Sequence, residues 1–154
     1  MEVIVHTDGG SRGTHEVPGA AVCGVTIDLP TGRLTLARRI PDATNNVAEY
    51  AGLIVALERL TVLSGRVTTL RVRMDSNLVV EQVKGAWKVK ALHLRLHHDR
   101  VRDLLAVISP AEFDIAHIPR ELNDAADALA NQAYLFEPGE TREWFEAVNL
   151  ATVR

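Results

Sequence analysis

Residues 67–83 read VTTLRVRMDSNLVVEQV and show two periodicities in a short space. Apolar and polar side chains alternate over residues 67–74, as in a strand with one buried face, and Asp75 follows directly. Ser76 is a favourable N-cap for a short helix that reaches Val83. A strand that leads straight into a helix begins a crossover between parallel strands, so this stretch predicts an α/β fold that contains parallel pairing.

The chain before this stretch predicts an antiparallel meander. Residues 2–7 alternate like a strand, and the Asp-Gly-Gly sequence at residues 8–10 ends it. Residues 20–27 and 34–40 also have strand-like patterns, and Pro-Thr-Gly at residues 30–32 separates them. Because short turns join antiparallel neighbours, we expect these three strands to lie side by side.

Helices and one more strand account for most of the remaining chain. Helical spacing of apolar residues begins after Thr44, with Thr44 or Asn45 as the cap and Gly65 beyond the end. The later elements are a helix over residues 91–107, a strand over 113–118 and a helix from its cap Asn123 to about Phe136. The order βββαβααβα predicts an α/β fold with a five-stranded mixed sheet, three antiparallel strands and then two parallel ones, flanked by helices. Residues 1–136 then form one domain and residues 137–154 a C-terminal tail.

The composition indicates a globular protein with a single core, because 154 residues of which 47% are hydrophobic suffice for one domain. No apolar run approaches the roughly 18 residues needed to cross a bilayer, and Cys23 is the only cysteine, so we expect a cytoplasmic protein without membrane association. The net charge of −3 argues against a protein that coats nucleic acid by charge alone. One segment is basic, and it is either a solvated helix face or a contact surface for a polyanion; it contains Lys84, Lys88, Lys90, Arg95, Arg100 and Arg102.

Two acidic residues, Asp8 and Asp75, stand where predicted strands end. Ligands of open sheets gather outside the carboxyl ends of the strands, so these carboxylates converge if the first and fourth strands are parallel neighbours. Taken one at a time, each residue is more simply explained as a turn or capping residue.

Two more acids lie on predicted helices. Glu49 falls on an apolar stripe of its helix, so its carboxylate faces the protein and needs a cation, either a metal ion or Arg71 or Arg73. Asp127 falls in the first turn of the last helix, where the helix dipole favours a negative charge, and Asp124 shares that explanation. No single acid decides the function, but three or four converging carboxylates suit Mg²⁺, which takes oxygen ligands.

Four segments, in this order, resemble the signatures of the ribonuclease H type 1 family. They read TDGG at residues 7–10, TNNVAEY at 44–50, DSNLVV at 75–80 and ADALA at 126–130. The resemblance covers about residues 2–135, and the fold of that family agrees with the predicted order of elements. It implies that Asp8, Glu49, Asp75 and Asp127 are catalytic acids that bind metal.

The resemblance implies an endonuclease that hydrolyses the RNA strand of RNA/DNA hybrids and leaves 3′-hydroxyl and 5′-phosphate ends. Two Mg²⁺ ions are the expected cofactor, with Mn²⁺ as a substitute, and the protein is expected to act as a monomer. The alternatives are a nuclease of the same fold that acts on duplex RNA or branched DNA, and a hybrid-binding module without catalysis. The intact set of four acids weighs against the binding module, because negative charge facing phosphate weakens binding.

The resemblance also suggests which residues contact the substrate. The side chains of Asn45, Asn46 and Asn77 resemble those that the family presents to the minor groove of the hybrid, although capping or a first helical turn would also explain Asn45 and Asn77. Trp87 either stacks on a sugar or base or fills the edge of the core. The remaining predicted contacts are Gly9, Gly10, Lys88, Lys90 and Arg120. The GAWKVK segment at residues 85–90 resembles compact family members that lack a long basic protrusion.

Two features depart from the family pattern. The loop of residues 11–19 reads SRGTHEVPG, which is longer than the usual Asn-Pro-Gly turn and lacks its Asn, so one substrate contact is missing. His117 has the spacing from Asn123 of the mobile histidine that assists product release in the family, but the strand pattern also allows it to be packed inside the sheet. Arg120 is the alternative residue for that role.

Overall fold

A mixed sheet of six strands forms the centre of the molecule in the computed structural model, which describes residues 1–148. Its strand order is β5-β4-β1-β2-β3-β6. The first three strands pair antiparallel, whereas β4 pairs parallel with β1 and β5 parallel with β4, as predicted. The strands are β1 (Glu2–Ser11), β2 (Gly19–Leu29), β3 (Gly32–Ala43), β4 (Thr69–Met74), β5 (Glu112–His117) and β6 (Thr141–Ala147).

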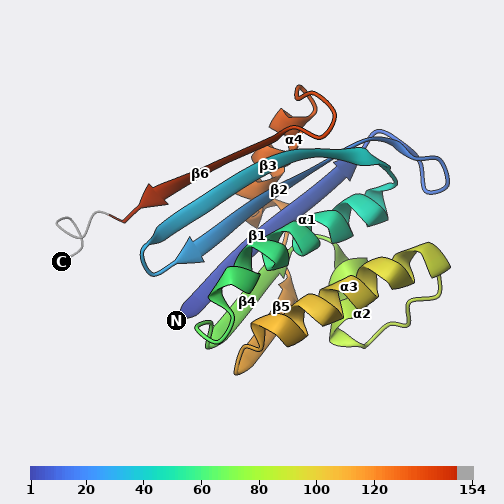
Figure 1. The fold of residues 1–154 in the computed structure, drawn as a ribbon. Helices are drawn as coiled ribbons and strands as arrows, with labels where there is room; N and C mark the ends of the chain where they lie inside the picture. Colours follow the sequence, from blue (N-terminus) through green and yellow to red (C-terminus); the bar gives the residue numbers. More distant parts are fainter. Residues whose placement is uncertain (149–154) are drawn as a thin grey trace.

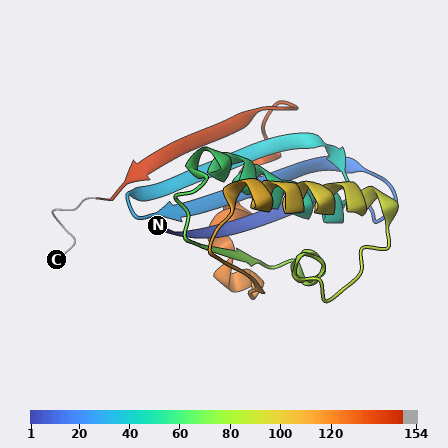
Figure 2. The same cartoon turned by 60° about the horizontal axis from the view of Figure 1, so that its bottom comes forward.

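Helices cover both faces of the sheet (Figures 1 and 2). The larger core lies beneath three of them, α1 (Asn45–Leu60), α2 (Asn77–Lys84) and α3 (Leu92–Ile108). A smaller core lies on the opposite face beneath α4 (Asp124–Ala133). Short 3-10 turns, η1 (Thr61–Leu63) and η2 (Arg120–Leu122), complete the described elements. Within residues 1–148, no helix is both long and apolar enough to span a membrane.

The helix starts follow from the capping residues. Thr44 Oγ1 accepts the Val47 N–H at 3.5 Å at the start of α1, and Ser76 Oγ accepts the Val79 N–H at 3.4 Å at the start of α2. Gly85 ends α2 in the left-handed conformation with φ of 84°. These caps confirm the predicted starts of both helices, and they place Glu49 in the second turn of α1 and Asp75 just before α2.

The main departure from the prediction lies in the segment expected to be a tail. There, Thr141–Ala147 forms β6 and pairs antiparallel with β3, so the sheet has six strands rather than five. Gly139 adopts a φ of 83° and its N–H donates to Arg39 O at 3.1 Å, which turns the chain back along β3. Arg59 of α1 then pairs with Glu143 of β6 at 2.9 Å. The sequence conceals this strand because its side chains are exposed on both faces, so no apolar alternation marks it.

The packing of α4 on β2 yields a test of the fold. A Cβ atom at Gly24 would lie 2.2 Å from Ala126 O and 2.6 Å from Ala130 N, so a side chain there would push α4 from the sheet. We expect Gly24→Ala to lower the free energy of unfolding by about 1–3 kcal/mol, the usual cost of overpacking. Gly52→Ala is the matched comparison, because its Cβ would lie 3.1 Å from the nearest atom, Asp8 O, and alanine favours a helix interior. Denaturant titrations measure the free energy of unfolding of both variants. If both variants lost the same free energy of unfolding, close packing at Gly24 would not explain the effect of Gly24→Ala.

Candidate active site

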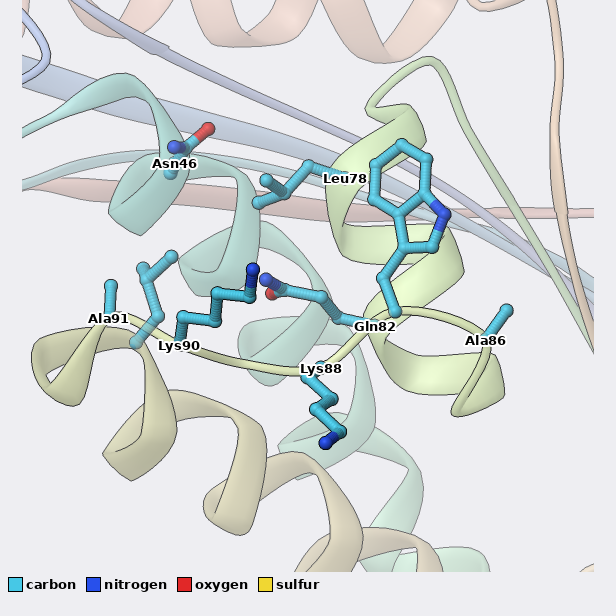
Figure 3. Close-up of a pocket in the computed structure, with 9 residues that line it drawn as sticks. Asn46, Leu78, Gln82, Ala86, Lys88, Lys90 and Ala91 are labelled. Atoms are coloured by element: carbon cyan, nitrogen blue, oxygen red, sulfur yellow. The ribbon is translucent and has the colours of Figure 1, made fainter.

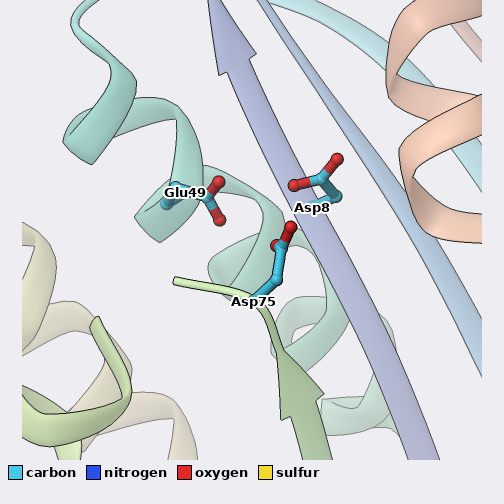
Figure 4. Close-up of side chains that lie close together, drawn as sticks. All are labelled: Asp8, Glu49 and Asp75. Carbon is cyan, nitrogen blue, oxygen red and sulfur yellow. The ribbon is translucent and has the colours of Figure 1, made fainter. Parts of the chain in front are cut away.

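Three carboxylates from separate elements converge where β4 ends beside β1 (Figure 4). Asp8 lies on β1, Glu49 on α1 and Asp75 directly after β4, and one oxygen of each lies within 4.8 Å of the others. The parallel pairing of β1 with β4 ends at Thr7 and Met74, so the next residue of each strand is an acid. The predicted convergence is therefore present in the structure.

The prediction that Asp8 closes the first strand is wrong. Antiparallel pairing of β1 with β2 continues beyond Asp8 as far as Ser11, so β1 projects past its parallel neighbour. Asp8 is thus held by pairing on one side while its other side is open toward Asp75. The Asp-Gly-Gly sequence resembles a turn, but tertiary pairing keeps it extended.

Glu49 reaches the other acids because α1 lies very close to β1. A Cβ atom at Gly9 would lie 2.2 Å from Ala48 O, so only glycine permits this approach. The alternative partners of Glu49 are excluded, since Arg73 Nη2 pairs with Asp114 at 2.8 Å and Arg71 with Asp114 at 3.8 Å. Glu49 Oε2 is buried and has no hydrogen-bond partner among the described residues.

Asp127 lies in the first turn of α4 and lines the same cavity of about 300 Å³ as the three converging acids. Arg120 Nη2 lies 3.5 Å from Asp127 Oδ1, and Asn131 Nδ2 donates to Asp127 Oδ2 at 3.4 Å. Asp127 is not a member of the close trio, although its carboxylate contributes to the raised pKa of Asp8. The structure thus brings the fourth predicted acid to the cavity.

Asn123 has a different role from the predicted cap of α4. Its side chain makes no capping hydrogen bond, and Nδ2 instead donates to Thr7 O at 2.9 Å and to Asp75 Oδ1 at 3.4 Å. The residue is only 1% exposed. Asn123 therefore connects the start of α4 to both strands that bear the acids, a link between distant segments that the sequence pattern does not reveal.

Two of the acids, Asp8 and Glu49, resist ionisation. Burial raises the pKa of Asp8 to about 8, with further contributions from Asp75 and Asp127. Burial also raises the pKa of Glu49 well above its usual range, followed by the charges of Asp8 and Asp75. A cation that bound here would reverse these shifts. The buried, unpartnered Glu49 Oε2 and the all-oxygen donor set fit a hard divalent metal ion.

Four of the predicted substrate residues line the acid cavity: Gly9, Gly10, Asn45 and Arg120. Asn45 also accepts the Ser11 N–H through Oδ1 at 2.9 Å, so it fixes the loop after β1. Sequence reasoning missed Ser11, Asn131 and Tyr134, which line the cavity as well. Asn131 and Tyr134 follow Asp127 by four and seven residues, a spacing that places all three on one helix face and that would have identified them.

A second cavity of about 560 Å³ contains other predicted residues, and one of them, Asn46, directly follows Asn45 of the acid cavity in sequence (Figure 3). Asn46, Trp87, Lys88 and Lys90 line it together with residues of α2. Trp87 is 47% exposed, so its ring does not fill the edge of the core. Asn77, the first residue of α2, is exposed and lines neither of these two cavities.

His117 lies at the end of β5, where its side chain is exposed rather than packed inside the sheet. It pairs in register with Met74, one residue before Asp75, but it does not line the acid cavity. Arg120 does line that cavity and contacts Asp127. Of the two alternatives for a mobile residue near the acids, Arg120 is the one placed at the cavity here.

The raised pKa of Asp8 gives a pH dependence for the metal-free protein. Folded Asp8 titrates at about 8, whereas in the unfolded chain its pKa is about 3.9. Between these values the folded protein keeps a proton that the unfolded chain has lost, so a rise in pH favours unfolding. In EDTA, the melting temperature of the parent should therefore fall as the pH rises from about 5 to about 8.

Asp8→Asn removes this titration, so it should reduce the pH dependence to the part that comes from Glu49, and it should melt above the parent in EDTA near pH 8. Millimolar Mg²⁺ should raise the melting temperature of the parent, because the ion binds the folded state. Asp114→Asn is the control, since it loses the same charge away from the acid cavity. Identical melting of parent and Asp8→Asn at every pH, with no shift by Mg²⁺, would show that the acids do not repel one another.

Comparison with known proteins identifies relatives of this chain. Residues 7–133 match the family model described as "Reverse transcriptase-like". The chain is 38% identical over 133 residues to ribonuclease HI of Halobacterium salinarum, covering 85% of this chain and 63% of that protein. It is 39% identical over 133 residues to the bifunctional protein Rv2228c of Mycobacterium tuberculosis, covering 86% of this chain but 35% of that protein. The chain thus spans about a third of the length of this mycobacterial relative.

Solved structures of ribonuclease H1 proteins are also similar to this chain. RNase H1 from Halobacterium salinarum superposes with a TM-score of 0.75 and 36% identity, over 86% of this chain and 97% of that one. LC11-RNase H1, solved in complex with an RNA/DNA hybrid, gives a TM-score of 0.74 and 38% identity, over 86% of this chain and 96% of that one. With its four acids in one cavity and these matches along most of its length, the chain belongs to the ribonuclease H type 1 family.

Proposed function

We propose that this protein is an endonuclease that hydrolyses the RNA strand of RNA/DNA hybrids and leaves 3′-hydroxyl and 5′-phosphate ends. The convergence of Asp8, Glu49 and Asp75 in a cavity that Asp127 also lines is the observation that carries the proposal. The similarity to LC11-RNase H1, which was solved with such a hybrid, supports the substrate class. The four acids come from one chain, which supports activity as a monomer.

In this proposal the four acids bind divalent metal. Two Mg²⁺ ions are expected, and Mn²⁺ can substitute for them. Metal bound there supplies a Lewis acid for the scissile phosphate and a more acidic water at neutral pH. The protein itself orients the ligands: Asn123 fixes Asp75 through its amide, while Asn131 fixes Asp127. Carboxylates positioned in this way would leave the activation of the attacking water to the bound metal.

The two neighbouring cavities suit a substrate with two strands. The acid cavity receives the strand that is cut, and the second cavity presents Lys88 and Lys90 to phosphates and the exposed Trp87 ring to a sugar or base. Asn45 and Asn46 are adjacent in sequence but line different cavities, so they stand where the two strands meet. Contacts of such amides with 2′-hydroxyls give a preference for RNA.

Hybrid cleavage tests the function directly. With Mg²⁺, the parent should cut the RNA strand of a labelled hybrid and spare its DNA strand. Asp75→Asn should lower turnover by more than about a hundredfold. Mutation of a residue that only orients a metal ligand already costs about 10–100-fold, and Asp75 is a proposed ligand itself. Asp114→Asn, which leaves the cavity intact, should retain parental turnover.

Gel assays on hybrid, duplex RNA, branched DNA and duplex DNA decide between the alternatives. Preferred cutting of duplex RNA or branched DNA would indicate the related nuclease activity, and binding without cutting would indicate a binding module. Parental turnover by Asp75→Asn would show that the site is assigned wrongly. A ligase joins a 3′-hydroxyl end to a 5′-phosphate end. Products that cannot be ligated would therefore refute the proposed position of the cleaved phosphodiester bond.

The second cavity makes its own prediction. Replacing both Lys88 and Lys90 by Ala should raise KM and lower the salt dependence of hybrid binding by about two in slope, because each phosphate contact releases about one counterion. The turnover number should change little. Fluorescence anisotropy titrations over a range of salt concentrations measure the slope. An unchanged slope would show that these lysines do not contact phosphate and are ordinary solvated side chains.

A further inference from the structure

An arginine stacks on a tyrosine at the rim of the acid cavity. Arg12 follows β1, and its guanidinium carbon lies 4.3 Å from the centre of the Tyr134 ring. Tyr134 lines the cavity that contains Asp8. Burial raises the pKa of the Tyr134 phenol, while the charge of Arg12 lowers it and that of Asp8 raises it. The guanidinium of Arg12 and the carboxylate of Asp8 therefore both act on the same ring.

The backbone at Arg12 is fixed rather than free. Its N–H donates across the base of the loop to Ala20 O at 2.9 Å. The preceding Ser11 N–H donates to Asn45 Oδ1 at 2.9 Å, which ties the loop to the start of α1. These bonds give Arg12 a defined position from which its side chain reaches Tyr134.

The backbone at Tyr134 is held by an arginine of β3. Arg39 of β3 donates through Nη1 to Tyr134 O at 3.4 Å and to Phe136 O at 3.2 Å. Phe136 and Ala133 are buried on either side of Tyr134 in the smaller core. Arg142 of β6 lies over the Phe136 ring at 4.3 Å. The end of α4 is therefore a rigid support for the Arg12 side chain.

The stacked arrangement leaves Arg12 ready to bind an anion. Stacking uses the face of the guanidinium, so the N–H groups on its edge remain available as donors in a planar fork that matches phosphate. None of the ion pairs formed within residues 1–148 includes Arg12. Arg12 is exposed, and its stacking partner Tyr134 lines the acid cavity, where a polyanionic strand would pass.

We propose that Arg12, held over Tyr134, binds a phosphate of the RNA strand beside the one that is cleaved. The inference rests on the proposed function, since it requires that the acid cavity receives the cut strand. Lys88 and Lys90 line a different cavity, so Arg12 contacts a separate part of the substrate. The loop of residues 11–19 lacks the Asn-Pro-Gly turn of the family, and Arg12 supplies a contact to the cut strand from that same loop.

Binding of uncut hybrid tests this role. The Asp75→Asn background prevents cutting. In this background, Arg12→Ala should raise the Kd for the hybrid by about tenfold, which is the effect of losing a charged hydrogen bond. The slope of log Kd against log salt should fall by about one. Arg66→Ala is the matched control, because Arg66 is an exposed arginine outside the acid cavity, and it should bind like the background protein. Arg12→Lys should fall between, since it keeps the charge without the fork.

A double-mutant cycle tests the part played by Tyr134. Tyr134→Ala should weaken binding about as much as Arg12→Ala, whereas Tyr134→Phe keeps the ring and should retain the affinity. In an Arg12→Ala background, Tyr134→Ala should have no further effect, because the ring acts through the arginine. In the active enzyme, Arg12→Ala should raise KM and leave kcat nearly unchanged.

The outcomes separate this inference from the proposed function. If Arg12→Ala binds hybrid like Arg66→Ala, or lowers only the melting temperature, Arg12 is a structural contact and the inference is wrong. Additive effects of Arg12→Ala and Tyr134→Ala would also overturn it, because the two residues would then act independently. A parent that neither binds nor cuts hybrid would instead refute the proposed function.

Discussion

Mutual repulsion among carboxylates is the constraint around which this structure is organised. Two unit charges about 5 Å apart repel by roughly 3 kcal/mol at an effective dielectric constant near 20, and folded domains have only about 5–15 kcal/mol of net stability. Asp8, Glu49 and Asp75 approach one another to within 4.8 Å. Burial, and then the charges of the neighbouring acids, raise the pKa values of Asp8 and Glu49, so the metal-free protein relieves part of the repulsion by retaining protons on these two residues. A bound cation would remove the same strain, so the site that destabilises the free protein is also the site whose donor atoms suit a metal ion.

The scaffold keeps these groups together through backbone approach rather than through opposite charge. Gly9 lets α1 lie directly on β1, and Gly24 lets α4 lie directly on β2. Asn123 then joins α4 to Thr7 and Asp75 with one buried amide. None of these contacts neutralises an acid, so the negative potential of the cavity is preserved for metal. An arginine in the place of Asn123 would tether the same elements, but it would pair with the carboxylates and compete with the ion.

The sequence predicted those parts of the molecule that have local causes. The caps at Thr44 and Ser76 and the alternation before Asp75 each act within a few residues, and the structure confirms them. The extended backbone at Asp8 and the amide bridge of Asn123 depend on partners far along the chain, so local patterns described them as a turn and a cap. The four acids could be assembled before the structure because their order matched a family, whereas residues that only support them carry no such signature.

The strand that local patterns missed also bears on the site. Phe136 and Arg142 flank the turn that leads from α4 into β6, and Arg39 of β3 holds the backbone of the same turn. Pairing of β6 with β3 thereby fixes the end of α4, whose first turn carries Asp127 and whose last residues lead to Tyr134. Because α4 is only ten residues long, its position is set at both ends, by Asn123 at the acids and by this turn near β6. The C-terminal segment thus contributes to the geometry of the cavity although none of β6 lines it.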